Sequence, residues 1–363
     1  MTTSRAWVFR GSNHPLQLES LPVEPLRQGE VRVAIECCTL CGSDLHTIEG
    51  RRSTPLPTVL GHEMLGRVVE LPRSETILSL SGEPLTIGSR ITWGVAASCK
   101  TCFYCTHDLP QKCESLFKYG HESLAKMPKL SGGLAETCHL TAGTAIAIVP
   151  DTMSFKVATP ASCATSTVAA AIRAADLRAG EHVVVQGCGM LGLTALAWCA
   201  MEDAASTIGI DIDHGRLAQA RAFGATHTLQ STADPQALTD EVLVLTAGRG
   251  CDVVLEMSGS NSAIERSVAM LRPGGRLILV GSVFPQPAVA LFAEQIVRKC
   301  LTIRGMHNYT PADLQSAITF LARASSRFPF ESLVPLEFSL DQLPQAIHSA
   351  HAERPPRVAI LNR

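Results

Sequence analysis

A glycine-rich loop near the middle of the chain constrains the fold more than any other stretch. Residues 181–186 form a short apolar run typical of a buried strand, and an alanine- and leucine-rich segment typical of a helix follows the loop. Glycines spaced as G-x-G-x-x-G permit a tight turn and a close approach of the backbone to a pyrophosphate, whose charge the helix N-terminus meets. The candidate dinucleotide-binding residues of this loop are Gly187, Gly189, Met190, Leu191 and Gly192.

A second strand-like run ends in a carboxylate, Asp211, about twenty residues after the loop. In this position an acidic side chain hydrogen-bonds the adenosine ribose and repels a 2′-phosphate. Asp211 therefore predicts NAD rather than NADP as the cofactor. Arg216 is a further candidate cofactor-binding residue, because an arginine here could receive a phosphate.

Strand-like and helix-like segments alternate from residue 181 to about residue 304, which predicts a parallel, doubly wound sheet. The expected strands are 250–256 and 276–281, the expected helices are 218–223 and 262–271, and the expected turn is Pro273-Gly274-Gly275. Val280 and Gly281 would present backbone groups at the carboxyl end of a strand, where a nicotinamide would lie.

The first part of the chain contains short β-branched runs and a segment with four cysteines. Cys99, Cys102, Cys105 and Cys113 are separated by two, two and seven residues. Four thiolates satisfy the coordination of Zn²⁺ and leave no position for water, which is typical of a structural site. A disulfide pair, a redox Cys-x-x-Cys motif and an iron–sulfur cluster are the alternatives. His107 could also replace one thiol as a ligand.

A second set of reactive side chains precedes the four cysteines. A thiol, a hydroxyl, a carboxylate and an imidazole lie close together in sequence at Cys41, Ser43, Asp44 and His46. A polar turn with a buried cysteine would have the same composition. His62 favours a metal site over a polar turn, because it supplies an imidazole just before the next strand-like run.

A catalytic zinc needs three protein ligands and an open fourth position, and two thiolates with one imidazole form one such set. Cys41 and His62 would supply two ligands. Our choice for the third is Cys163, at the junction of the two expected domains, and Cys138 and Cys37 are its competitors. Glu63 would act either as a transient ligand or as a hydrogen-bonding or salt-bridge partner.

Composition excludes several classes of function. The chain has 363 residues, 46% of them hydrophobic, which is enough for two domains with sizeable cores. A net charge of -2 and the lack of a basic run argue against a nucleic-acid partner. We expect a cytoplasmic protein that does not enter a membrane, since there is no secretory pattern and no apolar stretch long enough to span a bilayer. In that reducing compartment, 13 cysteines indicate metal ligation and buried thiols.

The Gly-His-Glu sequence at residues 61–63, the four-cysteine segment and the glycine loop, in that order, resemble the zinc-dependent medium-chain alcohol dehydrogenases over nearly the whole chain. The resemblance implies hydride transfer between a small alcohol and NAD, two zinc ions per chain, and a homodimer or homotetramer. It also implies an α/β fold with an active site between the domains. The implied domains are a GroES-like β-rich catalytic domain over 1–161 with a structural zinc lobe at about 97–115, a doubly wound Rossmann NAD-binding domain over 162–304, and a segment over 305–363 that returns to the catalytic domain.

The resemblance also assigns roles residue by residue. It places the catalytic zinc ligands on Cys41, His62 and Cys163, with Glu63 as the adjacent carboxylate. Many polyol-type relatives have glutamate as the third ligand, so this chain is closer to the alcohol dehydrogenase set. The remaining matches are Ser43 with the hydroxyl that takes the substrate proton, His46 with the histidine that passes it to solvent, and Asp44 with the carboxylate near the zinc.

Residues 50–57, 111–114 and 117–121 are similar to a branch of the family associated with phosphonate breakdown. This similarity implies a hydroxyalkylphosphonate or related small alcohol as substrate. The candidate anion contacts are then Arg51, Arg52, Lys118 and His121. Other interpretations are a polyol or secondary-alcohol dehydrogenase, a zinc-stabilised nucleotide-binding protein without catalysis, and a zinc-free quinone or enoyl reductase. The segment 71–88 reads as a loop insertion without a recognisable role.

Overall fold

The protein is described by a computed structural model that covers residues 2–73, 75–231 and 234–362. The chain divides into two compact units. The first comprises Met1–Ser166, Thr310–Ala322 and Phe330–Arg363, and the second comprises Thr167–Tyr309 and Arg323–Pro329. The divisions after residues 166 and 309 each lie five residues beyond the ends we expected, at 161 and 304. The tail belongs to the first unit, apart from residues 305–309 and 323–329.

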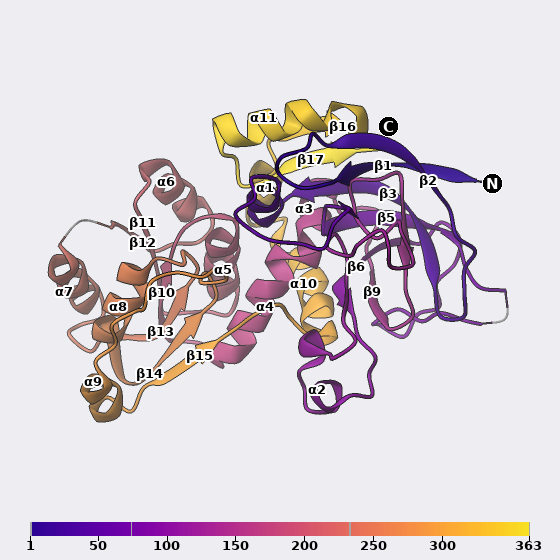
Figure 1. The fold of residues 1–363 in the computed structure, drawn as a ribbon. Coiled ribbons are helices and arrows are strands. Elements are labelled where there is room, and N and C mark those ends of the chain that lie inside the picture. Colours follow the sequence, from indigo (N-terminus) through magenta and orange to yellow (C-terminus); the bar gives the residue numbers. More distant parts are fainter. Residues whose placement is uncertain (1, 74, 232–233, 363) are drawn as a thin grey trace. The chain divides into compact units, whose positions relative to one another are not determined.

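A six-stranded parallel sheet forms the second unit, in the order β12-β11-β10-β13-β14-β15 (Figure 1). Its strands are β10 (His182–Gln186), β11 (Ser206–Asp211), β12 (His227–Gln230), β13 (Cys251–Glu256), β14 (Leu271–Leu279) and β15 (Thr302–Gly305). The helices are α5 (Met190–Met201), α6 (His214–Ala222), α7 (Pro235–Leu245), α8 (Asn261–Met270) and α9 (Ala293–Arg298), while α4 (Ala164–Ala175) leads into the unit. The prediction of a parallel, doubly wound sheet is confirmed.

Two predicted details of this unit are wrong. Helix α6 begins at His214 rather than at residue 218, because the Asp213 side chain caps it by accepting a hydrogen bond from the Arg216 backbone N–H. The Pro-Gly-Gly sequence at 273–275 does not separate two elements but lies inside β14. That strand pairs with β13 at Leu271 and again from residue 276 onward, with an irregularity between the two positions. Residues 272–275 are therefore accommodated within the pairing of β14 with β13.

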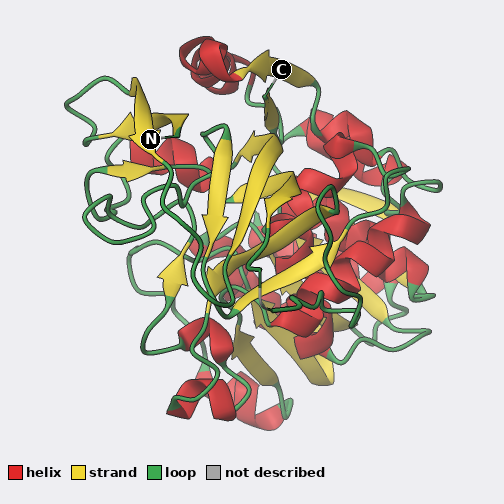
Figure 2. Ribbon diagram, turned by 90° about the vertical axis from the view of Figure 1, so that its right-hand side faces the viewer, coloured by secondary structure: helices red, strands yellow, loops and turns green. Residues whose placement is uncertain are grey.

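Two sheets make up most of the first unit (Figure 2). The smaller has the order β2-β1-β4, and the larger has the order β16-β17-β3-β5-β6-β7, with β8 paired to β3 and β9 paired to β6. The strands are β1 (Thr3–Phe9), β2 (Gln17–Pro22), β3 (Val31–Leu40), β4 (Thr58–Val59), β5 (Glu63–Glu70), β6 (Arg90–Ala97), β7 (Phe117–Lys118), β8 (Thr137–Leu140), β9 (Thr144–Ile148), β16 (Leu336–Ser339) and β17 (Val358–Leu361). The helices are α1 (Gly42–Ile48), α2 (Phe103–Thr106), α3 (Phe155–Ala158), α10 (Pro311–Ala324), which ends in the second unit, and α11 (Leu343–Glu353).

Burial in the core of the first unit fixes the pairing register of two neighbouring strands, β3 and β5. β3 and β5 run antiparallel with Thr39 opposite Glu63, and residues of both strands contribute to one cluster of buried apolar side chains. A one-residue slip would move these side chains to the opposite face, so the burial fixes the register. The end of β3 and the start of β5 therefore bring Cys41 and His62 to the same place.

Each unit has its own apolar cluster. Trp93, Met64 and Tyr119 are among the fully buried side chains of the first unit, and Val184, Ile208 and Val254 are among those of the second. In the described ranges, no helix is both long enough and apolar enough to cross a bilayer.

Candidate functional site

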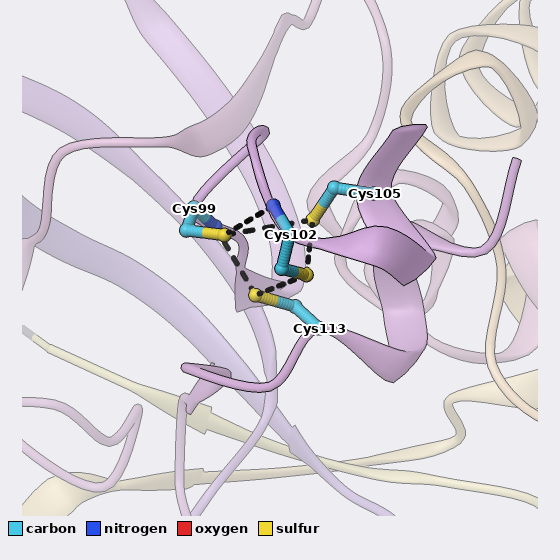
Figure 3. A group of neighbouring side chains, drawn as sticks. All are labelled: Cys99, Cys102, Cys105 and Cys113. Atoms are coloured by element: carbon cyan, nitrogen blue, oxygen red, sulfur yellow. Dashed lines mark hydrogen bonds between the residues drawn. The ribbon is translucent and has the colours of Figure 1, made fainter. Parts of the chain in front are cut away.

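The four cysteines of the 99–113 segment bring their thiols together (Figure 3). Their sulfur atoms all lie within 4.8 Å of one another. The Sγ atoms of Cys102 and Cys105 are 3.5 Å apart, and Cys99–Cys105 and Cys102–Cys113 are each separated by 3.9 Å. A tetrahedron with Zn–S bonds of ~2.3 Å has S–S edges of roughly 3.8 Å, so the four thiols fit one zinc ion. All four cysteines are free, in contrast to the disulfide alternative.

Hydrogen bonds from the loop support thiolates at this position. The backbone N–H of Cys102 donates to the Cys99 sulfur, and the N–H groups of Cys99 and Ser115 donate to the Cys113 sulfur. The hydroxyl of Thr101 and nearby backbone amides lower the pKa of Cys99 to about 6. His107 is directed elsewhere, because its ring stacks on Phe103 and its Nδ1 lies 2.7 Å from the Phe103 carbonyl oxygen.

A second potential metal site lies within the first unit. Ligand atoms of Cys41, His62 and Cys163 all lie within 4.8 Å of one another. Cys41 is the N-cap residue of α1, His62 directly precedes β5, and Cys163 follows the 3-10 helix Thr159–Ser162. The competing candidates Cys37 and Cys138 lie outside this group, buried in β3 and β8.

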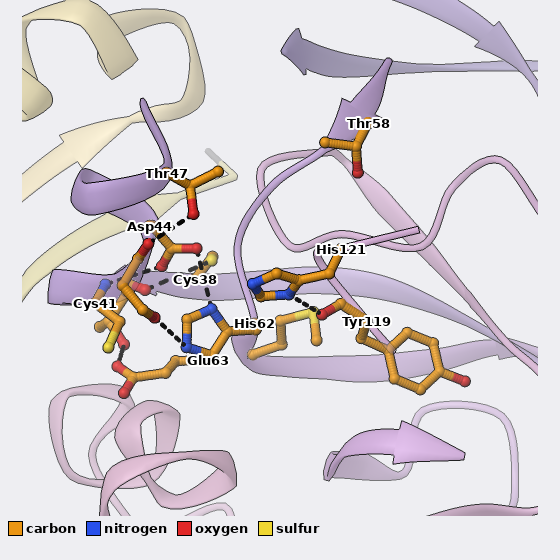
Figure 4. Close-up of polar contacts among 12 residues, drawn as sticks. Cys38, Cys41, Asp44, Thr47, Thr58, His62, Glu63, Tyr119 and His121 are labelled. Atoms are coloured by element: carbon orange, nitrogen blue, oxygen red, sulfur yellow. Dashed lines mark hydrogen bonds and ion pairs between the residues drawn. The ribbon is translucent and has the colours of Figure 1, made fainter. Parts of the chain in front are cut away.

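The Asp44 carboxylate contacts the His62 imidazole (Figure 4). Its Oδ1 lies 3.0 Å from His62 Nδ1, and its Oδ2 accepts a hydrogen bond from the Cys41 backbone N–H. A carboxylate only accepts, so Nδ1 carries a proton, and Nε2 can act as a ligand once it has lost its own proton. Ser43 Oγ is 3.3 Å from that Nε2. Burial alone would lower the pKa of His62, but Asp44 and Cys41 outweigh it and raise the pKa to about 10.

When no metal is bound, the pKa values of the Cys41 and Cys163 thiols are shifted in opposite directions. A hydrogen bond from Cys163 and the charges of Arg357 and His62 lower the pKa of Cys41 well below its usual value. The same hydrogen bond and burial raise the pKa of Cys163. The pair therefore holds one proton, which must leave if both sulfurs bind a cation.

Glu63 forms a buried ion pair with an arginine that the sequence analysis missed. Arg357 Nε lies 2.6 Å from Glu63 Oε2, and Arg357 Nη2 lies 2.7 Å from Oε1. The Thr39 hydroxyl donates to Oε2 at 2.6 Å, and Arg357 Nη2 is also 3.4 Å from Cys41 Sγ. The structure thus gives Glu63 the salt-bridge partner that we considered beside a ligand role. A lone arginine before the last strand offers no spacing pattern that would have identified it.

Lys118 and His121 each interact with one of the three candidate ligands. Burial and the charge of Arg52 lower the pKa of Lys118 to about 8, while the neighbouring Cys163 opposes the shift. The His121 ring is 5.4 Å from that of His62, and its Nδ1 lies 3.0 Å from the Tyr119 carbonyl oxygen (Figure 4). Arg51, by contrast, is exposed and pairs with Glu49.

The predicted nucleotide-binding residues meet at the carboxyl edge of the second unit's sheet. Gly187 follows β10 with a φ of +90°, and Gly189 is the N-cap residue of α5. Asp211 ends β11, where its Oδ2 accepts a hydrogen bond from the Cys188 N–H at 2.7 Å. Arg216 Nη1 lies 3.9 Å from the same oxygen. Such an edge, where the strand order reverses beside β10, is the usual ligand site of doubly wound sheets.

Val280 and Gly281 follow β14 at this edge, and their backbone N–H groups both donate to the Glu256 carbonyl oxygen at 3.0 Å. Glu256 itself was missed by the sequence analysis. Its buried carboxylate accepts hydrogen bonds from the N–H groups of Ser258 and Gly259, and burial raises its pKa. It therefore orders the loop after β13.

Comparisons with known proteins find two matching family models. The family model described as zinc-binding dehydrogenase matches residues 191–323, and the alcohol dehydrogenase GroES-like domain matches residues 27–151. A sorbitol dehydrogenase from Halalkalibacterium halodurans is 30% identical over 88% of both chains. A 5-exo-hydroxycamphor dehydrogenase from Pseudomonas putida is 28% identical over 97% of both chains.

The fold also matches solved structures. A crystal structure of an alcohol dehydrogenase from Thermotoga maritima has a TM-score of 0.93 and 26% identity, and covers 100% of both chains. Alcohol dehydrogenase TADH from Thermus sp. ATN1 has a TM-score of 0.84 and 25% identity, and covers 99% of this chain and 100% of its own. The predicted α/β fold, with a GroES-like and a Rossmann part, is confirmed. The chain belongs to the zinc-dependent medium-chain alcohol dehydrogenase family.

Proposed function

We propose that this enzyme oxidises a small alcohol by hydride transfer to NAD, with Cys41, His62 and Cys163 holding the catalytic zinc. The observation that carries the proposal is the convergence of two thiols and one imidazole within 4.8 Å, with His62 Nε2 left available by the Asp44 contact. The four-cysteine segment holds a second, structural zinc. It presents four thiols and leaves no position for a substrate.

Residues on α1 move the alcohol proton. Bound zinc lowers the pKa of an alcohol hydroxyl, so that the proton leaves near neutral pH. Ser43 accepts this proton, since its Oγ lies 3.3 Å from His62 Nε2 and hence beside the ligands. His46 follows one helical turn later and passes the proton outward.

The cofactor is NAD rather than NADP. The Asp211 carboxylate ends β11 and would repel a 2′-phosphate. Arg216 neutralises part of that charge at 3.9 Å, but Asp211 also accepts two backbone hydrogen bonds that hold it at the loop. The glycine loop and the N-terminus of α5 receive the pyrophosphate, and the backbone at Val280 and Gly281 lies where the nicotinamide is expected.

The substrate is a hydroxyalkylphosphonate, and its anionic group is held by Lys118 and Arg52. Within the described residues, neither side chain has a carboxylate partner, and both are partly buried. Lys118 interacts electrostatically with Cys163, one of the proposed metal ligands. A cation without a carboxylate partner at this position favours an anionic substrate over a polyol.

A substrate panel tests this assignment. Formation of NADH by the zinc-loaded enzyme would be followed with hydroxyalkylphosphonates, simple alcohols and polyols. We expect saturable turnover of the phosphonates, and we expect Lys118→Met to raise KM for them at least tenfold. Lys126→Met is the control, because Lys126 is exposed and pairs with Glu122. Turnover confined to polyols or plain alcohols would exclude the phosphonate and leave the zinc chemistry.

The pKa of Lys118 predicts how the affinity for the phosphonate depends on pH. The pKa of Lys118 is lowered from 10.5 to about 8, so the side chain is cationic below that pH and loses its charge above it. The affinity for the phosphonate should therefore fall as the pH rises through about 8. This loss should be absent in Lys118→Met. An affinity that is constant between pH 7 and pH 9 would argue against Lys118 as the anion contact.

The enzyme assembles as a homodimer through the edge of the second unit's sheet. β15 is the edge strand, and the chain between β14 and β15 carries three apolar side chains that are more than half exposed: Val283, Phe292 and Val297. An edge strand with apolar neighbours is a ready template for pairing with another chain. A homotetramer would add a second interface to this one.

A further inference from the structure

A turn after β7 brings a second histidine beside the candidate ligand His62. The chain turns back at residues 118–121, where the backbone N–H of His121 donates to the Lys118 carbonyl oxygen at 3.1 Å. Gly120 has a φ of +73°, and a Cβ there would lie 2.6 Å from the Gly61 carbonyl oxygen. A residue without a side chain lets the turn pack against the backbone just before β5. The rings of His121 and His62 are consequently 5.4 Å apart.

The two ring nitrogens of His121 have different surroundings. Nδ1 lies 3.0 Å from the Tyr119 carbonyl oxygen, and a carbonyl only accepts, so Nδ1 carries a proton. The residue is 7% exposed, and Nε2 is buried without a hydrogen-bond partner among the residues that the structure describes. In Figure 4 this nitrogen is turned away from Tyr119, toward the side of the view on which His62 and Asp44 lie. Buried polar atoms are nearly always paired, so an unpaired one beside a ligand indicates a partner that binds there.

The surrounding charges make Nε2 an acceptor. A second proton would give His121 a buried positive charge with the cations of Arg52 and Lys118 nearby. Burial, followed by the charges of His62, Arg52 and Lys118, lowers the pKa of His121 well below its usual value. Positive charge at the ligand site acts in the same direction whether His62 or a bound cation carries it. A neutral His121 offers a lone pair at Nε2, which suits a hydrogen-bond donor and not the oxygens of an anion.

We propose that His121 determines substrate specificity, with its Nε2 accepting a hydrogen bond from a second hydroxyl of the substrate. The inference rests on the proposed function, and it narrows the substrate to a dihydroxyalkylphosphonate. One hydroxyl is oxidised at the metal ligands, the phosphonate lies against Lys118 and Arg52, and the other hydroxyl donates to His121. An analogue without that hydroxyl would leave Nε2 buried and unpaired, which lowers its affinity.

Two phosphonates that differ by one hydroxyl test this contact. Formation of NADH by the zinc-loaded enzyme would be followed with a hydroxypropylphosphonate and with the corresponding dihydroxypropylphosphonate. We expect wild type to prefer the dihydroxy compound by about tenfold or more in kcat/KM, because a buried acceptor is satisfied only by that compound. The preference should lie in KM, since the second hydroxyl contributes to binding and takes no part in hydride transfer.

Two amide variants separate the acceptor from a structural role. His121→Asn places an amide near the position of Nδ1, where it can still donate to Tyr119, but it does not reach the position of Nε2. His121→Gln reaches that position with a carbonyl oxygen. We expect His121→Asn to raise KM for the dihydroxy compound by about tenfold with little change for the monohydroxy compound, and we expect His121→Gln to restore the preference. His348→Asn, at an exposed histidine of α11, is the control.

The outcomes separate this inference from the function on which it rests. Equal kcat/KM for the two phosphonates in wild type, or an undiminished preference in His121→Asn, would overturn the acceptor role and leave the phosphonate assignment. A loss of preference that His121→Gln does not restore would also overturn it, because the role would then be structural. Turnover of polyols or plain alcohols without turnover of either phosphonate would refute the proposed substrate, and the inference with it.

Discussion

At the scale of single residues, the stability of the first unit depends on two buried charges next to the proposed metal ligands. Glu63 and Arg357 are paired through two short contacts, and their side chains are 0% and 6% exposed. Removing one partner of a buried pair leaves the other charge in a poorly solvated place, which costs far more than the pair contributes. The pair therefore holds β17 beside the metal ligands only while both members are present.

Replacing one member should destabilise the protein strongly. We expect Arg357→Met to lower the free energy of unfolding by about 3–5 kcal/mol in urea, because Glu63 is left as an uncompensated buried carboxylate. The double variant Glu63→Gln/Arg357→Met should recover most of this loss. Arg5→Met is the control, since Arg5 is 45% exposed in its pair with Glu136. Equal losses for Arg357→Met and Arg5→Met would contradict the argument.

Asp44 has a different role at the same scale, because it fixes the orientation of His62. We expect Asp44→Ala to weaken zinc binding at Cys41, His62 and Cys163 by about 10–100-fold, as outer partners of ligand histidines generally do. After dialysis against a chelator, the variant should retain only the zinc of the four-cysteine segment, which serves as an internal control. Retention of both ions would show that Asp44 does not orient the ligand.

At the scale of elements, the turn from β10 to α5 depends on glycines for two different reasons. A Cβ at Gly192 would lie 1.8 Å from the Gly187 carbonyl oxygen, whereas a Cβ at Gly189 would meet nothing within 4 Å. Gly192 therefore allows helix and strand to pack closely. Gly189 leaves space at the helix N-terminus, where a pyrophosphate would approach.

This difference predicts opposite outcomes for two similar substitutions. Gly192→Ala should lower the unfolding temperature of the free protein, because the loop must shift to relieve the contact. Gly189→Ala should leave that temperature unchanged and weaken NAD binding, measured by calorimetry or fluorescence titration. If Gly189→Ala bound NAD normally, the loop would not be the pyrophosphate site.

At the scale of the whole molecule, two units with separate cores carry different parts of the chemistry. The proposed metal ligands belong to the first unit, and the glycine loop and Asp211 belong to the second. The exposed apolar side chains of Val283, Phe292 and Val297 belong to the second unit as well.

The proposed interface predicts that charged substitutions within it convert the dimer to a monomer. We expect the double variant Phe292→Glu/Val297→Glu to sediment as a monomer, because each chain would place charges in an apolar contact. Val244→Glu is the matched control. Val244 is also an apolar side chain, 77% exposed, but it lies on α7 and outside the proposed interface. A wild-type monomer, or a double variant that remains a dimer, would exclude this edge.

Local patterns made much of the fold and the candidate site predictable. The glycine loop and the carboxylate of Asp211 each follow a strand at a fixed distance, so chain geometry alone brings them to one edge. The four cysteines lie in one short loop, and their spacing already limits how far the thiols can separate. Cys41 and His62 are predictable from the residues around them, although the sequence left Cys163 in competition with Cys37 and Cys138.

Tertiary structure decided what had no local signal. Pro273 and its two glycines have the composition of a turn, but strand pairing on both sides keeps them within β14. Arg357 reaches Glu63 because β17 pairs antiparallel with β3, with Val358 opposite Leu40. His351 reaches Glu49 from a helix near the C-terminal end of the chain. The sequence by itself determined motifs whose residues are close along the chain, and tertiary structure decided the distant contacts, because these depend on burying apolar surface across the whole unit.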